Sequence, residues 1–254
     1  ATPAQAVTAS AAQSSTVRPV STGVTPEQFG AKGDGIADDL QALQAAMQQA
    51  SASGRPLELT AGAGYRFSSC LGLPSGLTIR GNGAVLLSDI QYPDLREDRV
   101  AVELMKDSDD DRAHDVRLEN VTFRAADSCQ ANYMLRVMLA RNVEFVGCTF
   151  DCEPNEWGRC AADLYGGNEN IRFEGCVFRQ MTSGASGGIW VRNWTDRVES
   201  RNICFQNCEF YKSGADELLA VWGWGGAVRD VVLSGCSFYE TQTQEGLDAD
   251  HRPV

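Results

Sequence analysis

The chain has 254 residues, of which 43% are hydrophobic, and a formal net charge of −12. Such acidity argues against a nucleic-acid-binding protein, because that binding depends on neutralising phosphates, although sequence-distant Lys and Arg residues can still form a local basic patch. The sequence has no apolar run long enough to span a membrane, retains no signal peptide at its start, and carries no motif that calls for a cofactor.

The first segment, residues 1–22, consists largely of Ala, Ser, Thr and Gln. A segment with so few large apolar residues cannot bury enough surface to order itself. We therefore expect a flexible linker or arm that becomes ordered only against a partner.

Residues 23–56 predict an N-terminal cap with a helix over about 38–50. The glycines of the stretch Phe29–Ile36 permit tight turns with positive φ, and Asp38 is a natural helix N-cap. A helix of this kind can cover the open first coil of a solenoid. The apolar residues that share one helical face are Leu40, Leu43 and Met47.

The stretch Phe29-Gly-Ala-Lys-Gly-Asp-Gly35, followed by two Asp residues and a Gln/Ala-rich helix, resembles the N-terminal signature of the pectate-lyase-like β-helix superfamily. The lead-in Val24-Thr-Pro-Glu27 is similar to the version found in bacteriophage tailspikes, and Ala37 stands where Thr is usual. The resemblance continues to about residue 86. It implies a parallel β-helix, whereas the chemistry of the superfamily ranges over lyases, hydrolases, epimerases and inert adhesins.

A pattern that recurs five times predicts a solenoid over residues 57–254. Each copy begins with Asn or Asp, alternates apolar and polar residues, shifts that alternation once, and ends on Phe. In the copy Asn142–Phe150 the shift falls at Gly147 and predicts a corner between two short strands. The rest of each copy can hold a third strand. Copies start 27, 28, 32 and 28 residues apart, at Asp115, Asn142, Asn170, Asn202 and Asp230. The predicted fold is an all-β, right-handed, single-stranded parallel β-helix with a short N-terminal α-helical cap.

Coils stacked about 4.8 Å apart place equivalent residues in ladders. We predict an Asx ladder that exchanges side-chain hydrogen bonds, a Phe ladder and a Cys ladder. Buried thiols behave as small hydrophobic groups, so reduced interior cysteines are favoured, with one disulfide among four loop and strand-end cysteines as the alternative. No metal site is predicted, since the chain has no CxxC pair and two His residues. The residues of the disulfide alternative are Cys129, Cys148, Cys152 and Cys160.

The third strand of each coil collects aromatic and charged residues about 20 positions after the repeat start. Apolar sugar faces stack on indole rings, and sugar hydroxyls bond to charged side chains. Two carboxylates about 5–10 Å apart can hydrolyse a glycosidic bond. The alternative is that single Trp residues fill the coil interior and single acids are solvated. The predicted substrate-binding residues are Arg136, Trp190, Arg192, Trp222 and Trp224. The predicted catalytic residues are Asp163, Asp216, Glu217, Asp248 and Asp250, with Glu240 considered beside them.

The function favoured by these features is recognition of a bacterial surface polysaccharide and its depolymerisation by a glycoside hydrolase mechanism. A non-catalytic receptor-binding or structural tail protein is the alternative. A secreted polysaccharide lyase or epimerase comes third, because Gly246–His251 loosely resembles a motif of mannuronan epimerases. The tailspike resemblance implies a homotrimer, contacts of the N-terminal segment with other tail proteins, and a virion-tail or extracellular location. We expect further chain or another subunit to cover the last coil.

Overall fold

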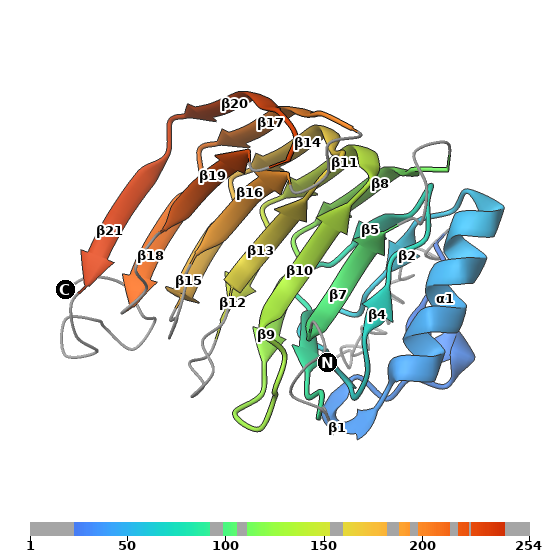
Figure 1. Cartoon of the computed structure of the whole chain (residues 1–254). Coiled ribbons are helices and arrows are strands. Elements are labelled where there is room, and N and C mark those ends of the chain that lie inside the picture. The colour runs from blue at the N-terminus through green and yellow to red at the C-terminus, as the bar shows by residue number, and fades with distance from the viewer. Residues whose placement is uncertain are drawn as a thin grey trace, which may run out of the picture.

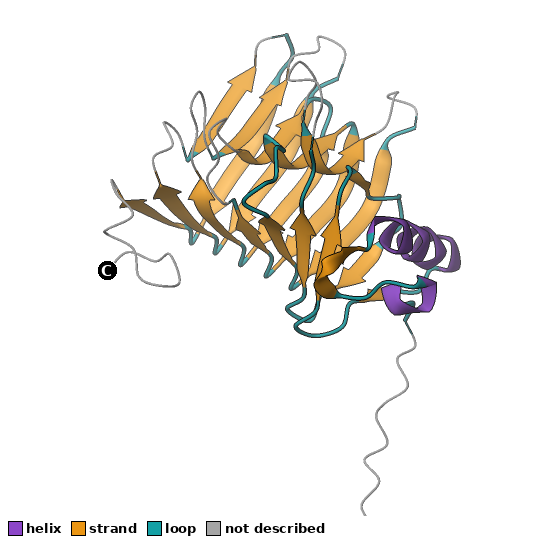
Figure 2. Ribbon diagram, turned by 90° about the horizontal axis from the view of Figure 1, so that it is seen from below, coloured by secondary structure: helices purple, strands orange, loops and turns teal. Residues whose placement is uncertain are grey.

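The structure is a computed structural model in which coils of chain stack along one axis (Figure 1). It describes residues 23–91, 99–105, 111–152, 160–181, 188–193, 198–213, 218–223 and 225–241. Within these residues six successive coils, from Leu57 to Gly223, contribute one strand to each of three sheets, the last coil contributes a strand to two of them, and the strands pair in parallel. The fold is therefore the predicted parallel β-helix, and Figure 2 shows its rows of strands with the helix at one end.

The three sheets are named A, B and C, and their strands are given in the order in which they pair. Sheet A contains β2 (Leu57–Glu58), β5 (Thr78–Arg80), β8 (Ala113–Glu119), β11 (Ala140–Val146), β14 (Glu169–Glu174), β17 (Ser200–Gln206) and β20 (Val228–Ser234). Sheet B contains β1 (Asp34–Asp38), β3 (Gly64–Phe67), β6 (Val85–Ser88), β9 (Thr122–Ala125), β12 (Thr149–Asp151), β15 (Val177–Met181), β18 (Glu209–Ser213) and β21 (Ser237–Thr241). Sheet C contains β4 (Leu71–Gly72), β7 (Val100–Met105), β10 (Tyr133–Met138), β13 (Cys160–Tyr165), β16 (Ile189–Asn193) and β19 (Leu219–Gly223).

Two residues with a left-handed backbone conformation, that is with positive φ, shape each repeat. Asn142 bends β11 at a φ of 54°, and Gly147 turns the chain from β11 into β12 at a φ of 60°. Asn and Gly tolerate this backbone region better than other residues do, which explains their places in the repeat. The predicted corner at Gly147 is confirmed. The equivalent Asx residues with positive φ are Asp115, Asn170, Asn202 and Asp230.

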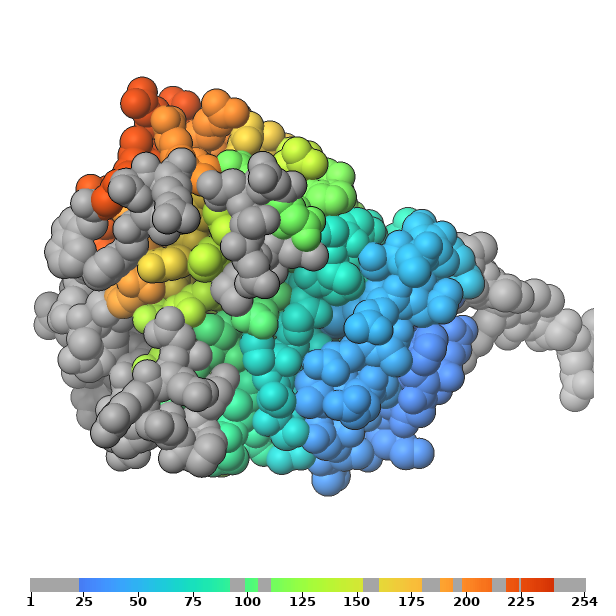
Figure 3. All heavy atoms as spheres, turned by 45° about the vertical axis from the view of Figure 1, so that its right-hand side comes forward, coloured from blue at the N-terminus to red at the C-terminus, as the bar shows by residue number. Residues whose placement is uncertain are grey.

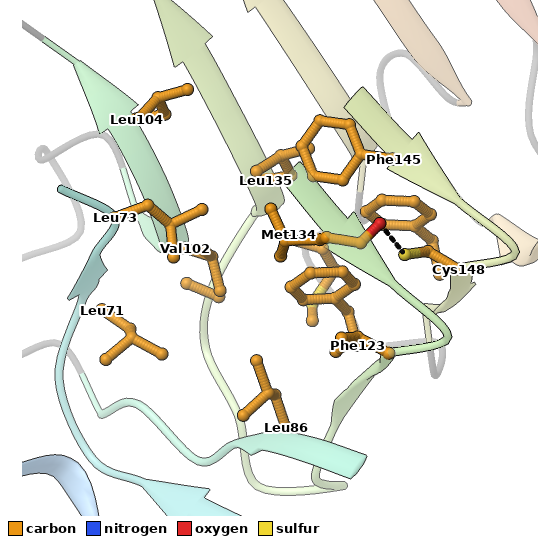
Figure 4. Close-up of a cluster of buried hydrophobic side chains, with 14 of the residues drawn as sticks. Leu71, Leu73, Leu86, Val102, Leu104, Phe123, Met134, Leu135, Phe145 and Cys148 are labelled. Atoms are coloured by element: carbon orange, nitrogen blue, oxygen red, sulfur yellow. Dashed lines mark hydrogen bonds between the residues drawn. The ribbon is translucent and has the colours of Figure 1, made fainter. Parts of the chain in front are cut away.

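The predicted Phe ladder fills the interior (Figure 4). Each coil stacks its Phe on that of the next, with ring centroids 4.7–5.1 Å apart. A second column on sheet A packs edge to face against the first, as Phe145 does against Phe150 at 6.0 Å. The first column is Phe123, Phe150, Phe178, Phe210 and Phe238, and the second is Phe145, Phe173 and Phe205.

Four of the nine cysteines, Cys148, Cys176, Cys208 and Cys236, occupy the corner beside these columns as thiols. Cys148 donates a hydrogen bond to the Leu118 carbonyl oxygen at 3.5 Å, and Cys176 donates to that of Phe145 at 3.3 Å. All nine cysteines of the chain lie among the described residues, and none of them forms a disulfide bond. The interior-thiol prediction is confirmed, and the disulfide alternative is wrong.

The helix α1 (Leu40–Ser53) closes the N-terminal end of the solenoid, preceded by the 3-10 helix η1 (Pro26–Phe29). Leu43 and Met47 are fully buried, and Figure 3 shows this cap in blue over the end of the coils. The helix starts two residues later than predicted, and its N-cap is Asp39 instead of Asp38, so that detail was wrong.

The reason lies in the glycine turn. The Asp39 carboxylate accepts hydrogen bonds from the backbone N–H groups of Lys32 (2.7 Å) and Gly33 (3.0 Å), which fold around it. Asp38 instead accepts a hydrogen bond from the first helical N–H, that of Leu40, at 3.2 Å. Asp39 thus holds the glycine turn, and Asp38 holds the first turn of the helix.

The opposite end of the described solenoid leaves core residues open. Phe238 is 48% exposed, although the rings stacked before it in the ladder are fully buried, and Val221 and Leu233 are exposed beside it. The described part of the chain contains no helix both long and apolar enough to cross a membrane.

Candidate functional site

The outer face of sheet C carries a packed group of aromatic and charged side chains, here called the sheet C cluster. Strand pairing places Arg136, Asp163 and Trp190 in one row along the axis. A second row holds Tyr165, Arg192 and Trp222. The alternate positions of the same strands point inward, as the two-residue period of a strand requires. The cluster consists of Tyr133, Arg136, Cys160, Asp163, Tyr165, Trp190, Arg192 and Trp222.

Asp163 is the centre of the cluster and is fully buried. Its Oδ2 accepts a hydrogen bond from Arg136 Nε at 3.1 Å. Arg192 donates through Nε to Oδ1 at 2.7 Å and through Nη2 to Oδ2 at 2.8 Å. Such charge-assisted, partly bidentate pairs fix the geometry of both arginines. Burial alone would lower the pKa of Arg192, but the hydrogen bonds and charge of Asp163 outweigh it and raise that pKa.

Aromatic rings surround the two guanidinium groups. The Arg136 guanidinium lies 4.5 Å from the ring centroid of Tyr133, and that of Arg192 lies 4.5 Å from Trp190 and 4.9 Å from Tyr165. These cation–π contacts are stronger in a desolvated setting. The cluster is therefore a preorganised layer of rings and charges outside the coil core.

The two described indoles of the predicted site lie on this outer face, so the alternative that they fill the coil interior does not hold for them. Their ring centroids are 5.3 Å apart. Trp190 is 8% exposed, and its Nε1 is buried and has no hydrogen-bond partner among the described residues. Buried indole N–H groups usually have an acceptor. This orphaned donor is the feature of the cluster that packing alone does not explain.

The structure brings together five of the predicted site residues and leaves five untested. Arg136, Asp163, Trp190, Arg192 and Trp222 all belong to the sheet C cluster. Glu240 lies on β21 of sheet B, away from them. The predicted residues outside the described part of the chain are Asp216, Glu217, Trp224, Asp248 and Asp250.

Sequence reasoning missed the two tyrosines of the cluster. Tyr165 lies two residues after Asp163 on the same strand, so strand alternation could have placed it on the same face. Tyr133 lies three residues before Arg136, and alternation alone places it on the opposite face. A bend at the start of β10 turns Met134 into the core and Tyr133 outward, which no local pattern signalled.

The sequence predicts no metal site. Among the described residues, no group of three or more His, Cys, Asp or Glu side chains is placed to hold a metal ion. Asp34, for example, uses one carboxylate oxygen to accept hydrogen bonds from the N–H groups of Ile36 and Ala37, both at 2.9 Å.

Residues 24–243 match the family model described as rhamnogalacturonase A/epimerase, pectate lyase-like. The chain belongs to this pectate-lyase-like family. The match covers the cap, all described coils and the sheet C cluster. A comparison with curated proteins gives no match.

Solved structures support the same fold for this pectate-lyase-like chain. The surface adhesin PfbA of Streptococcus pneumoniae aligns with a TM-score of 0.62 at 19% identity, over 86% of this chain and 61% of that one. ORF18 of Geobacillus virus E2 aligns with a TM-score of 0.56 at 16% sequence identity, over 84% of this chain and 41% of that one. Endo-xylogalacturonan hydrolase of Aspergillus tubingensis aligns with a TM-score of 0.50 at 16% sequence identity, over 85% of this chain and 64% of that one. The chain thus spans less than two thirds of each, and at these identities the likeness concerns the fold.

Proposed function

We propose that this pectate-lyase-like protein recognises a bacterial surface polysaccharide on the outer face of sheet C. The observation that carries the proposal is the buried Trp190 Nε1, a donor for which the described part of the chain holds no acceptor, beside two guanidinium groups fixed by Asp163. A sugar hydroxyl or ring oxygen supplies the missing acceptor. The neighbouring Trp222 offers a partly exposed indole on which an apolar sugar face can stack.

The rigidity of the cluster supports binding of a chain with many hydroxyl groups. Asp163 holds both arginines in place before any ligand arrives, so little side-chain entropy is lost on binding. The rows run along the solenoid axis, and successive coils repeat at about the strand spacing of 4.8 Å. An extended polymer lying along the axis therefore meets several coils in turn.

Binding is tested with purified capsular polysaccharides and lipopolysaccharides on a biosensor surface. Trp190→Phe keeps an aromatic ring but removes the N–H together with the five-membered part of the indole, so we expect a loss of at least about 3–10-fold in affinity, the range of one net hydrogen bond. Trp222→Ala should lose more, because a stacking surface disappears. If neither variant differs from the unaltered protein, the sheet C cluster is not the binding site.

Cleavage by a glycoside hydrolase mechanism is the second part of the proposal. Asp163 is the single predicted catalytic acid among the described residues, and its bonds to two arginines suit a positioning role better than proton transfer. Hydrolysis would then depend on the predicted acids at 216, 217, 248 and 250. New reducing ends after incubation with the polysaccharide support hydrolysis, and their loss in Asp248→Asn or Glu217→Gln assigns the acid.

A non-catalytic receptor-binding or tail protein is the second candidate, favoured by the arginine-bound state of Asp163. Binding without products in the same incubation would select it. A lyase or epimerase is the third candidate. A lyase yields unsaturated uronates, which absorbance detects, and an epimerase yields epimerised residues, which NMR detects.

We further propose a homotrimer located on a virion tail or outside the cell, with residues 1–22 contacting other tail proteins. Light scattering measures the oligomer.

A further inference from the structure

A groove lies on the outer face of sheet A, on a different side of the solenoid from the sheet C cluster. It has a volume of about 660 Å³ and crosses the five coils that contain β8, β11, β14, β17 and β20. The sequence predicts an Asx ladder that exchanges side-chain hydrogen bonds between coils, and the whole ladder also lines this sheet A groove. Its members are Asp115, Asn142, Asn170, Asn202 and Asp230.

The ladder is held rigid by its own hydrogen bonds. Asn142 Nδ2 donates to Asp115 Oδ1 at 2.9 Å, Asn170 Nδ2 to Asn142 Oδ1 at 3.0 Å, and Asn202 Nδ2 to Asn170 Oδ1 at 2.9 Å. A primary amide has two N–H groups, and the ladder uses one of them. The three Asn residues of the ladder are exposed, so each of them presents a second N–H donor to the groove, whereas Asp115 and Asp230 offer only acceptor oxygens.

One wall of the groove is a row of side chains that are in register on successive strands. It begins with Arg117 and Glu144, which form an ion pair, and continues with Arg172 and Cys204. Cys204 stands where a second acid would complete the alternation of charges. The row therefore ends without a carboxylate next to Arg172 on that side.

Arg172 carries a second orphaned donor. Its Nη2 donates to Gln206 Oε1 at 2.9 Å and pairs with Glu174 Oε2 at 3.0 Å, but its Nε is buried and none of the described residues accepts its hydrogen bond. The Nε of the equivalent Arg117 donates to Glu119 at 2.6 Å. The Arg172 side chain as a whole is 40% exposed and lines the groove, so an oxygen atom of a ligand can reach the exposed part of its guanidinium group.

We propose that the sheet A groove binds a second glycan strand, which lies along the solenoid axis with its hydroxyl groups on the Asn ladder and on Arg172. Fixed amides and a guanidinium offer the donors and acceptors that hydroxyl groups need. Nucleic acid fits poorly, because Asp115, Glu144 and Asp230 also line the groove. An extended peptide lying in the groove fits poorly as well, because β8, β11, β14 and β17 below it are each paired on both sides within the sheet.

The test uses Cys204 as a reporter within the groove. The protein is alkylated with iodoacetamide in the presence of cellohexaose, maltohexaose or hexagalacturonate, and modification of each thiol is followed by peptide mass spectrometry. We expect at least one oligosaccharide to slow alkylation of Cys204 by fivefold or more. Cys236 lies outside the groove lining and is an internal control whose rate should not change. If no oligosaccharide protects Cys204, the proposal is wrong.

Variants separate this groove from the sheet C site. Arg172→Ala should weaken protection of Cys204 about tenfold, the loss of a hydrogen bond to a charged group. Arg172→Lys, which keeps the charge and lacks Nε, should weaken it as well and serves if the alanine variant folds poorly. Arg80→Ala, on the same sheet outside the groove, is the matched control. Trp190→Phe should leave protection unchanged. Equal loss in the Arg80 or Trp190 variant would overturn the assignment.

Discussion

Removal of the Asp163 carboxylate is the sharpest test of how the sheet C cluster is built. Asp163→Ala takes three hydrogen bonds from Arg136 and Arg192, which are 7% and 8% exposed. Breaking a buried ion pair from one side typically costs about 3–5 kcal/mol, because the charge left behind remains desolvated. Two arginines lose their shared partner here, so we expect a loss of at least about 3 kcal/mol in the free energy of unfolding.

Urea denaturation followed by circular dichroism measures this loss. With a slope of about 3 kcal/mol per molar, a loss of 3 kcal/mol lowers the unfolding midpoint by about 1 M. Glu58→Ala is the control, since it breaks the half-exposed pair with Arg80 at 2.9 Å and should cost about 1 kcal/mol or less. If Asp163→Ala shifts the midpoint no more than the control, the buried pairs do not hold the cluster and the reasoning fails.

Asp163→Asn separates a positioning role from a catalytic one. The amide keeps the shape and one acceptor oxygen, so the variant should be more stable than Asp163→Ala. A positioning residue predicts weaker polysaccharide binding with any cleavage reduced in proportion. Full loss of cleavage at unchanged affinity would instead show that Asp163 transfers a proton.

Three further predictions concern the ladders and corners. Phe178→Ala, in the middle of the Phe ladder, should cost about 3–5 kcal/mol, whereas Phe238→Ala, at the half-exposed end, should cost far less, as measured by urea midpoints. Gly147→Ala should cost more than Gly175→Ala in a thermal melt, because both have φ near 60° but only the first Cβ would lie 2.6 Å from a side-chain oxygen of the preceding coil. The side-chain hydrogen bond from the next ladder amide holds the pKa of Asp115 below its usual value. Its stabilising effect is therefore present above the unfolded pKa of about 4 and is lost as the pH falls through the lower folded value, so Asp115→Asn should flatten the acid limb of a stability–pH curve.

The coil architecture could be predicted because its signal repeats. A single copy such as Asn142–Phe150 is ambiguous, but five copies with the same shift in alternation define which residues face inward. The stacking of Phe123 on Phe150 and the thiol at Cys148 follow from that parity alone. Local pattern and tertiary packing agree at these positions, so sequence reasoning succeeds there.

The start of the helix could not be decided from local sequence. Asp38 and Asp39 are both good capping residues, and propensity does not rank two identical neighbours. Their roles are set by the glycine turn, whose N–H groups at Lys32 and Gly33 surround Asp39 alone. That contact depends on the tertiary path of the turn.

The sheet C cluster was predicted as a set of residues but not as a set of bonds. Repeat counting put Asp163 on one face with Arg136 and Arg192, and an acid on a sugar-binding face then suggested catalysis. The actual contacts depend on side-chain rotamers and on how deeply the face is covered, which strand periodicity does not report. The full burial of Asp163 is the fact that changes its interpretation.

The constant interval between sheets A and B has a consequence for evolution. From Val116 to Phe123, from Val143 to Phe150 and from Ile171 to Phe178 the same number of residues separates the two stacked positions, although whole repeats differ in length. Every insertion or deletion between repeats therefore flanks sheet C. Descendants of this chain can gain or lose residues in the segments around sheet C while the stacked core stays the same, so the surface of that face can change without a new fold.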